Sequence, residues 1–196
     1  MNFLAHIYLA RPTPESVIGN VIADLVKGPA VALLPQAVRD GVMMHRHVDA
    51  FTDRHPRVQR SIARISANWG WFSGIILDVH YDHLLARDWL RYSDEPLRSF
   101  ADRAYATLRG AEAFLGDEAR DFLDHFIDDD RLVRYASIDG LTDTLEGVSR
   151  RIAKRMPTRA LPLAEAVPEL QALDAELTED FRAFFPELVR YAGELG

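Results

Sequence analysis

Helical periodicity interrupted by proline and glycine is the feature that most constrains how this chain folds. Apolar residues recur at the three- and four-residue spacing of one helix face, and no segment shows the strict alternation typical of a half-buried strand. With 196 residues, 48% of them hydrophobic, the chain is long and apolar enough to bury one core. We therefore expect residues 1–196 to form a single all-α domain, an irregular bundle of helices.

Proline and glycine also predict where the helices begin and end. The expected helices cover residues 3–9, 14–27, 35–55, 56–67, 74–91, 96–115, 117–127 and 137–155. The tail from residue 162 to residue 195 is expected to be helical, with breaks at Pro168 and Pro186.

Composition and charge exclude several classes of protein. The chain contains no cysteine, which rules out disulfides, thiolate metal ligands and a cysteine nucleophile. Its formal net charge of −7 argues against nucleic-acid binding through phosphate attraction. No apolar run approaches the roughly 20 residues of a membrane span, and the first residues lack the pattern of a signal peptide. We expect a cytoplasmic protein that binds neither nucleic acid nor membranes.

Two polar clusters lie in segments that are otherwise apolar. Asn20 and Asp24 are four residues apart, and His45, Asp49 and Thr52 follow the i, i+4, i+7 spacing of one helix stripe. A histidine and an aspartate one turn apart can ligate one metal ion, or the aspartate can orient the histidine. Each pattern taken alone is also typical of a structural hydrogen bond or a buried ion pair.

A third cluster combines Asp78, Asp82 and His83 within an apolar run. Two carboxylates on one helix face repel each other unless a cation or a proton lies between them. The alternative is that both acids face solvent and pair with arginines later in the helix. His6, in the apolar N-terminal segment, is a weaker candidate, because a lone histidine there is usually a hydrogen-bonded core residue.

Together, these acids and histidines favour a metal site. A helical bundle can bring side chains from separate helices to one centre, as carboxylate–histidine metal proteins do. The chain has no glycine-rich phosphate loop and no G-x-S-x-G elbow, so metal-assisted hydrolysis is the reaction class that this set supports best. Histidine and carboxylate ligands suit manganese, magnesium, iron or zinc.

Basic residues gather late in the chain. Arg150, Arg151, Lys154 and Arg155 occur without an acidic residue between them, and Arg159 follows. On a chain of net negative charge, this is a local basic patch suited to an acidic partner. The alternative is that these cations stabilise a helix C-terminus and cover a solvated face.

The clusters occur in an order that resembles the bacterial acyl carrier protein phosphodiesterase family. The motifs that carry the resemblance are Met1-Asn2-Phe3-Leu4-Ala5-His6, Gly19-Asn20-x-x-x-Asp24, His45-Arg46-x-x-Asp49-x-x-Thr52-Asp53 and Asp78-x-x-x-Asp82-His83-x-Leu85. The likeness is strongest over residues 1–90 and continues more loosely through Leu132-Val133-Arg134-Tyr135 and the Arg150-Arg151 pair. No single motif is specific, but their combination is.

The resemblance implies an enzyme that removes phosphopantetheine from holo acyl carrier protein, giving apo acyl carrier protein and free phosphopantetheine. It also implies kinship with HD-domain phosphohydrolases, which are helical and metal-dependent and favour manganese. An HD domain carries His before Asp, whereas the adjacent pair here is Asp82-His83, so the HD ligand roles do not transfer one to one.

On this basis we expect a Mn²⁺ site, with Mg²⁺ or another divalent ion as the alternative. The candidate metal ligands are His6, Asp24, His45, Asp82 and His83. Asp49 or Asp78 would orient or deprotonate the attacking water, and Arg46 or Arg134 would neutralise the phosphate. Because acyl carrier proteins are small and strongly acidic, the expected docking surface consists of Arg150, Arg151, Lys154 and Arg155.

Two other functions stay open at this point. An HD-like hydrolase of a nucleotide or another small phosphodiester would use the same site without the basic patch. A non-catalytic helical binding module would instead carry the polar clusters as buried ion-pair networks and bind no metal. The sequence predicts no particular oligomeric state.

Overall fold

In the computed structural model, residues 1–159 and 161–195 are described, and they form helices and turns with no strand among them. The prediction of an all-α fold is confirmed. The α-helices are α1 (Phe3–Leu9), α2 (Pro14–Ile22), α3 (Gln36–Arg54), α4 (Pro56–Trp69), α5 (Ser73–Arg87), α6 (Leu97–Leu108), α7 (Asp117–Asp128), α8 (Arg131–Arg134), α9 (Ile138–Arg155), α10 (Val167–Ala172) and α11 (Asp174–Glu194). The 3-10 helices are η1 (Gly28–Leu33), η2 (Gly70–Phe72), η3 (Trp89–Arg91), η4 (Arg109–Phe114), η5 (Pro157–Arg159) and η6 (Leu163–Ala166).

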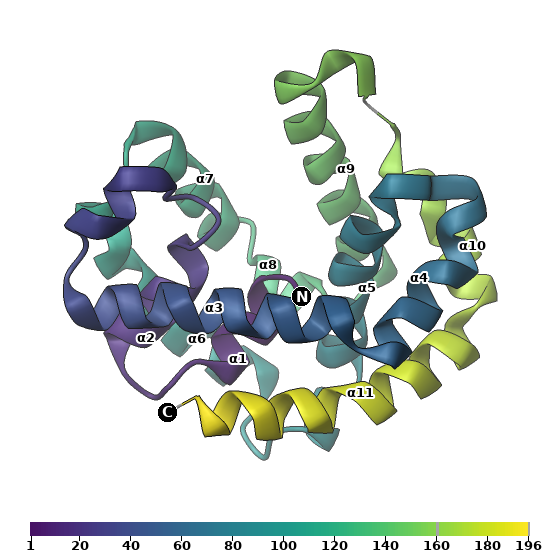
Figure 1. The fold of residues 1–196 in the computed structure, drawn as a ribbon, viewed down its shortest axis with the longest axis horizontal. Helices are drawn as coiled ribbons and strands as arrows, with labels where there is room; N and C mark the ends of the chain where they lie inside the picture. The colour runs from purple at the N-terminus through teal and green to yellow at the C-terminus, as the bar shows by residue number, and fades with distance from the viewer. Residues whose placement is uncertain (160, 196) are drawn as a thin grey trace.

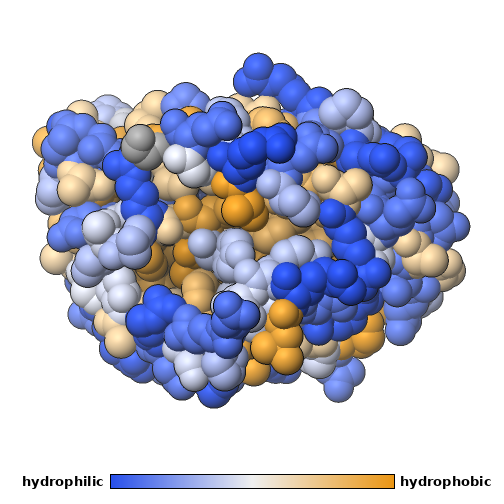
Figure 2. Space-filling model, turned by 90° about the horizontal axis from the view of Figure 1, so that it is seen from below, coloured by the Kyte–Doolittle hydropathy of each residue, from blue (hydrophilic) through white to orange (hydrophobic). Residues whose placement is uncertain are grey.

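Helix α3 crosses the front of the molecule, α11 runs along its lower edge, and α7 and α9 rise on opposite sides (Figure 1). Helix α5 is buried nearly all round, including Ile76, Leu77 and Leu85. A helix that is buried on nearly every side belongs at the centre of a core. Seen from below, hydrophilic side chains cover most of the surface, and hydrophobic ones show in a recess and in small patches (Figure 2).

Helices α2 and α3 approach each other closely through two glycines. A Cβ atom added to Gly19 would lie 2.8 Å from the Cα of Gly41 and 2.2 Å from the carbonyl oxygen of Val38. Only glycine fits at this crossing. The close approach sets the end of α2 against the middle of α3, where His45 lies.

The structure corrects several predicted helix ends. Helix α2 ends at Ile22 rather than Lys27, because the amides of Leu25 and Val26 both bond to the carbonyl of Ile22 and close the helix. Asp24 therefore lies in the turn after α2 and not on its face. Helices α5 and α6 end earlier than predicted and continue as the 3-10 turns η3 and η4.

The predicted break at Pro186 is wrong, whereas the one at Pro168 falls beside the change from η6 to α10. Pro168 lies in the first turn of α10, where proline costs no hydrogen bond. Pro186 lies inside α11, which continues through it. Phe184, Phe185 and Leu188 are fully buried on either side of this proline, and their burial offsets the one missing backbone hydrogen bond.

Every helix in residues 1–159 and 161–195 is too short or too polar to cross a lipid bilayer.

Candidate metal centre

The candidate centre forms where α1 meets α3. His6 Nε2 lies 3.0 Å from Asp49 Oδ1, and His45 Nε2 lies 3.0 Å from Asp49 Oδ2. The two imidazole rings stack with their centroids 3.7 Å apart. Within the described ranges, His6, His45 and Asp49 are the only group of three or more potential ligands whose donor atoms all lie within 4.8 Å of one another.

The orientation of His45 is the most informative feature of this group. Its Nδ1 lies 2.8 Å from the backbone carbonyl of Asn20, and a carbonyl only accepts, so Nδ1 carries a proton. Nε2 then faces the Asp49 carboxylate and also lies 3.6 Å from Asp24 Oδ1. A neutral imidazole would direct a lone pair at these two acids, so a cation must lie there, either a proton on Nε2 or a metal ion. Metal-ligating histidines commonly donate their other N–H to a backbone carbonyl in this way.

Two further groups flank the centre. Asp24 is 65% exposed, so it faces the solvent side of the pair. The Met1 amino nitrogen lies 2.9 Å from Asp78 Oδ1 and 3.6 Å from Asp49 Oδ1. Asp78 is therefore joined to the centre through this amino group.

The ionisation of these groups follows from burial and charge. Burial acts to lower the pKa of His45, but the adjacent carboxylates of Asp24 and Asp49 raise it to about 9. Burial lowers the pKa of His6 to about 4. Burial acts to raise the pKa of Asp49, but the two histidines and the Met1 ammonium hold it well below its usual range. The two carboxylates thus favour a positive charge at His45.

Asp82 lies beside the centre, but its carboxylate accepts hydrogen bonds from backbone amides. Its two oxygens accept from the amides of Leu4 (2.7 Å) and Ala5 (3.1 Å), at the start of α1. Burial raises the pKa of this carboxyl to about 7, although the two amides act against that shift. Asp82 anchors the N-terminus of α1, as carboxylates do at helix N-termini. It thereby holds in place the helix that carries His6.

His83 points to a different neighbour. Its Nδ1 lies 2.8 Å from the carbonyl of Tyr135, and desolvation lowers its pKa. Within the part of the chain that the structure describes, it does not join His6, His45 and Asp49 in one ligand group. Ligation by Asp82 or His83 stays a prediction of the sequence.

Comparison with known proteins decides the family. The family model described as acyl carrier protein phosphodiesterase matches residues 1–188. Proteins named acyl carrier protein phosphodiesterase from Salmonella agona (strain SL483) and Salmonella newport (strain SL254) are each 33% identical over 98% of this chain and 97% of their own length.

The chain belongs to the acyl carrier protein phosphodiesterase family.

The resemblance seen in the sequence is thereby confirmed. No solved structure matches the chain.

The two arginines predicted to neutralise phosphate in this member of the acyl carrier protein phosphodiesterase family have other partners. Arg46 is exposed on α3, with Nη1 3.8 Å from the sulfur of Met43. Arg134 pairs with Asp143 of α9. Among the described residues, neither forms an ion pair with a carboxylate of the centre. Their predicted role stays a prediction.

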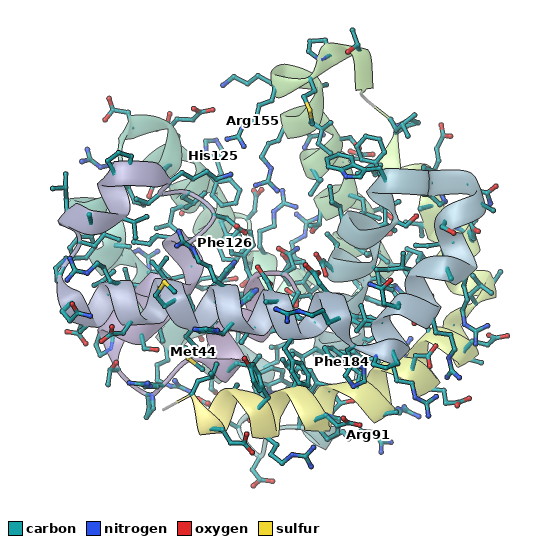
Figure 3. All side chains as sticks on the ribbon, viewed as in Figure 1. Met44, Arg91, His125, Phe126, Arg155 and Phe184 are labelled. Carbon is teal, nitrogen blue, oxygen red and sulfur yellow. The ribbon has the colours of Figure 1, made fainter. Side chains whose placement is uncertain are left out.

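The basic residues of this family member lie on α9 and face α7. Lys154 Nζ lies 3.1 Å from Glu118 of α7, and the Arg151 guanidinium lies 4.7 Å from the Phe122 ring centroid. Arg150 pairs with Glu146 at 3.4 Å within α9. Figure 3 shows Arg155 reaching from α9 toward the side of α7. The side chain of Arg159 lies outside the described residues.

Sequence reasoning missed two backbone groups at the centre of this family member, the Met1 amino group and the carbonyl of Asn20. Backbone groups carry no residue-type signal. The hydrogen bond of 3.1 Å from Asn2 to Tyr135 was not predicted either, because the two residues are 133 positions apart, although both occur in the family motifs.

Proposed function

We propose that this protein hydrolyses the phosphodiester that links phosphopantetheine to a serine of holo acyl carrier protein, releasing apo acyl carrier protein and free phosphopantetheine. In this reaction water adds to the phosphorus, the bond to the serine oxygen breaks, and that oxygen leaves with a proton. The proposal combines the family with one observation, the His45 Nε2 that faces two carboxylates while its Nδ1 is held by a backbone carbonyl.

The proposed ligands of a divalent ion, with Mn²⁺ first and Mg²⁺ as the alternative, are His6, His45, Asp49 and Asp24. Two imidazole nitrogens and carboxylate oxygens suit such ions. When bound, the ion would polarise a phosphoryl oxygen and lower the pKa of a water molecule beside it. This ligand set differs from the one predicted from the sequence. It adds Asp49, which was expected to act on the attacking water, and omits Asp82 and His83, which bind backbone groups of α1 and Tyr135.

The remaining residues have supporting roles in this proposal. Asp78 is partly exposed (40%) beside Asp49, and desolvation raises its pKa, so it is the better candidate to accept a proton from the attacking water. Asp82 and the Asn20 carbonyl position His6 and His45. A positive group is also needed for the phosphate, and Arg46 and Arg134 remain candidates alongside Arg151.

The proposed docking surface for the acidic carrier protein is the basic patch of α9, formed by Arg150, Arg151, Lys154 and Arg155. The ion pairs of Arg150 and Lys154 join side chains that are all more than half exposed. Such pairs contribute little to stability, so these cations are free to exchange their partners for carboxylates of a docking protein.

The reaction is tested by incubating the protein with holo acyl carrier protein and Mn²⁺ and measuring the intact mass of the carrier. We expect the carrier to lose the mass of phosphopantetheine and chelation to stop the loss. A carrier that keeps its prosthetic group with Mn²⁺, Mg²⁺ and other divalent ions would refute the proposed function.

Docking is tested separately by reversing the charge at Arg150 and Lys154 together. We expect KM for holo carrier protein to rise by about tenfold or more, with hydrolysis of bis(p-nitrophenyl) phosphate unchanged. Arg91→Glu is the matched control, because Arg91 is exposed beside α11, far from α9 (Figure 3). Equal effects of the two variants would contradict the docking surface.

A further inference from the structure

A cavity of about 360 Å³ lies between α7 and α9. This volume falls within the range of roughly 300–1,000 Å³ that is typical of small-molecule sites. The rings of Phe3, Phe122 and Phe126 form an apolar wall of the cavity, with the Phe3 centroid 5.6 Å from Phe122 and 5.0 Å from Phe126. Figure 3 shows Phe126 on α7, on the side toward which Arg155 reaches from α9.

The rest of the cavity is polar. Its hydrogen-bonding and cationic lining includes Asn2, Tyr135, Thr144, Arg150, Arg151 and Lys154. Rings on one side and donors and acceptors on the other suit a ligand that combines methyl and methylene groups with amides and hydroxyls. A protein helix, about 10 Å wide with its side chains, is too large for this space.

The cavity begins beside the candidate metal centre. Asn2 lines it and donates to Tyr135 Oη at 3.1 Å, and the preceding residue, Met1, places its amino nitrogen 2.9 Å from Asp78. Arg151 also lines the cavity, with its guanidinium 4.7 Å from the Phe122 ring centroid.

We propose that this cavity binds the pantetheine arm of the substrate, which runs from the phosphate at the metal centre into the space between α7 and α9. This inference rests on the proposed function. The arm carries a geminal methyl pair and methylenes that match the phenylalanine wall, and two amides and a hydroxyl that match Asn2, Tyr135 and Thr144. Arg151, a cation of the cavity lining, would meet the phosphate.

Gly147 offers a direct way to fill the cavity. It lines the cavity from inside α9, and a Cβ added there would meet only Arg150 Nη2, at 3.8 Å. Gly147→Leu should therefore preserve the helix while its side chain occupies the space of the arm. Gly74→Leu is the matched control, because Gly74 lies in α5 with nothing within 4 Å of an added Cβ. Phe122→Ala, at a partly exposed position of the apolar wall, is a second variant.

The experiment measures KM and kcat for holo acyl carrier protein and for bis(p-nitrophenyl) phosphate, which has no arm, with melting temperatures to verify folding. We expect Gly147→Leu to raise KM for the carrier by about tenfold or more and to leave the small substrate within about twofold. We expect Phe122→Ala to shift the same ratio in the same direction and Gly74→Leu to change neither. Folded Gly147→Leu and Phe122→Ala proteins with wild-type KM for the carrier would overturn the cavity assignment and leave the proposed function intact.

A direct binding measurement distinguishes an error in the cavity assignment from an error in the proposed function. Calorimetry with free pantetheine, with inorganic phosphate as the comparison, should show pantetheine binding that Gly147→Leu abolishes. If the wild type does not cleave holo carrier protein but still binds pantetheine in this way, the proposed function fails and the cavity assignment stands. Binding of phosphate alone, with no binding of pantetheine, would overturn the assignment.

Discussion

Two clusters of charged side chains hold a carboxylate in this fold, and they differ in what neutralises it. Asp180 of α11 is completely buried and is surrounded by donors of α4: Arg60 Nε at 3.0 Å, Ser61 Oγ at 3.2 Å and Arg57 Nη1 at 3.4 Å. Asp49 of α3 lies instead between two stacked imidazoles. The first carboxylate has a complete set of partners.

The second cluster remains dependent on a cation. The Met1 amino group lies 3.6 Å from Asp49, but it does not reach His45 Nε2, which faces Asp49 and Asp24. Arginine donors neutralise a buried acid permanently, whereas histidine nitrogens with carboxylates form a site that a proton or a metal can occupy in turn. We therefore propose a structural role for the Asp180 cluster and a chemical role for the Asp49 cluster.

The largest expected difference between the clusters is in activity. Asp49→Asn should lower kcat/KM for holo carrier protein by about a thousandfold, since it removes a carboxylate from the proposed ligand set. Asp180→Asn should leave activity per folded molecule within about twofold. Steady-state kinetics normalised to folded protein tests both. If the two variants lose activity equally, the division between the clusters fails.

The next effect is on the pH dependence of stability. The folded pKa of His45, about 9, is above its ordinary value of 6.5, so the folded protein keeps a proton that the unfolded chain loses. This contribution, up to about 3 kcal/mol, is fully present below pH 6.5 and is lost as the pH rises through about 9. Urea unfolding of the metal-free protein between pH 6 and pH 9 should show this decline.

His45→Gln isolates the contribution of His45 from those of other titrating groups. Its stability should decline less than that of the wild type over the same pH range. Saturating Mn²⁺ should also flatten the wild-type curve, because the metal replaces the proton. Identical slopes for the wild type and His45→Gln would show that His45 is not the titrating group.

The smallest of the three effects is the direct loss of stability in the structural cluster. Asp180→Asn should lower the free energy of unfolding by about 2 kcal/mol, less than for a fully buried pair, since its arginine partners are 31–44% exposed and regain water. Metal-free Asp49→Asn should also lower it, because the Asp49 carboxylate stabilises the positive charges of His45 and the Met1 ammonium. Urea unfolding at pH 7 with and without Mn²⁺ separates the clusters: Mn²⁺ should stabilise Asp180→Asn as it does the wild type, and an equal stabilisation of Asp49→Asn would contradict the assignment.

Much of the fold follows from local patterns. Helices α3, α7 and α9 begin and end within a few residues of their predicted limits, because proline, glycine and N-cap residues act locally. The break predicted at Pro186 does not occur, because α11 is stabilised by packing against distant segments of the chain, which the local sequence does not reveal. Kinship with HD domains stays a prediction.

The site was predictable in its side chains but not in their arrangement. The spacing of His45 and Asp49 on one helix stripe predicted their convergence, and Asp24 and His6 were candidates because each is a polar residue in an apolar segment. Asp82 has the same residue type and helical setting as a ligand, and only the position of α1 makes it a partner of backbone amides. The Asp180 cluster carried no signal, since its partners are about 120 residues away in the chain.

Anomalous diffraction at the manganese edge, from crystals grown with Mn²⁺, tests the metal centre most directly. The account predicts one strong peak at coordination distance from His6 Nε2, His45 Nε2 and an Asp49 oxygen, with Asp24 close by, and no such peak in crystals of Asp49→Asn. The absence of a peak at this place in the wild type, or a peak elsewhere in the fold, would contradict it.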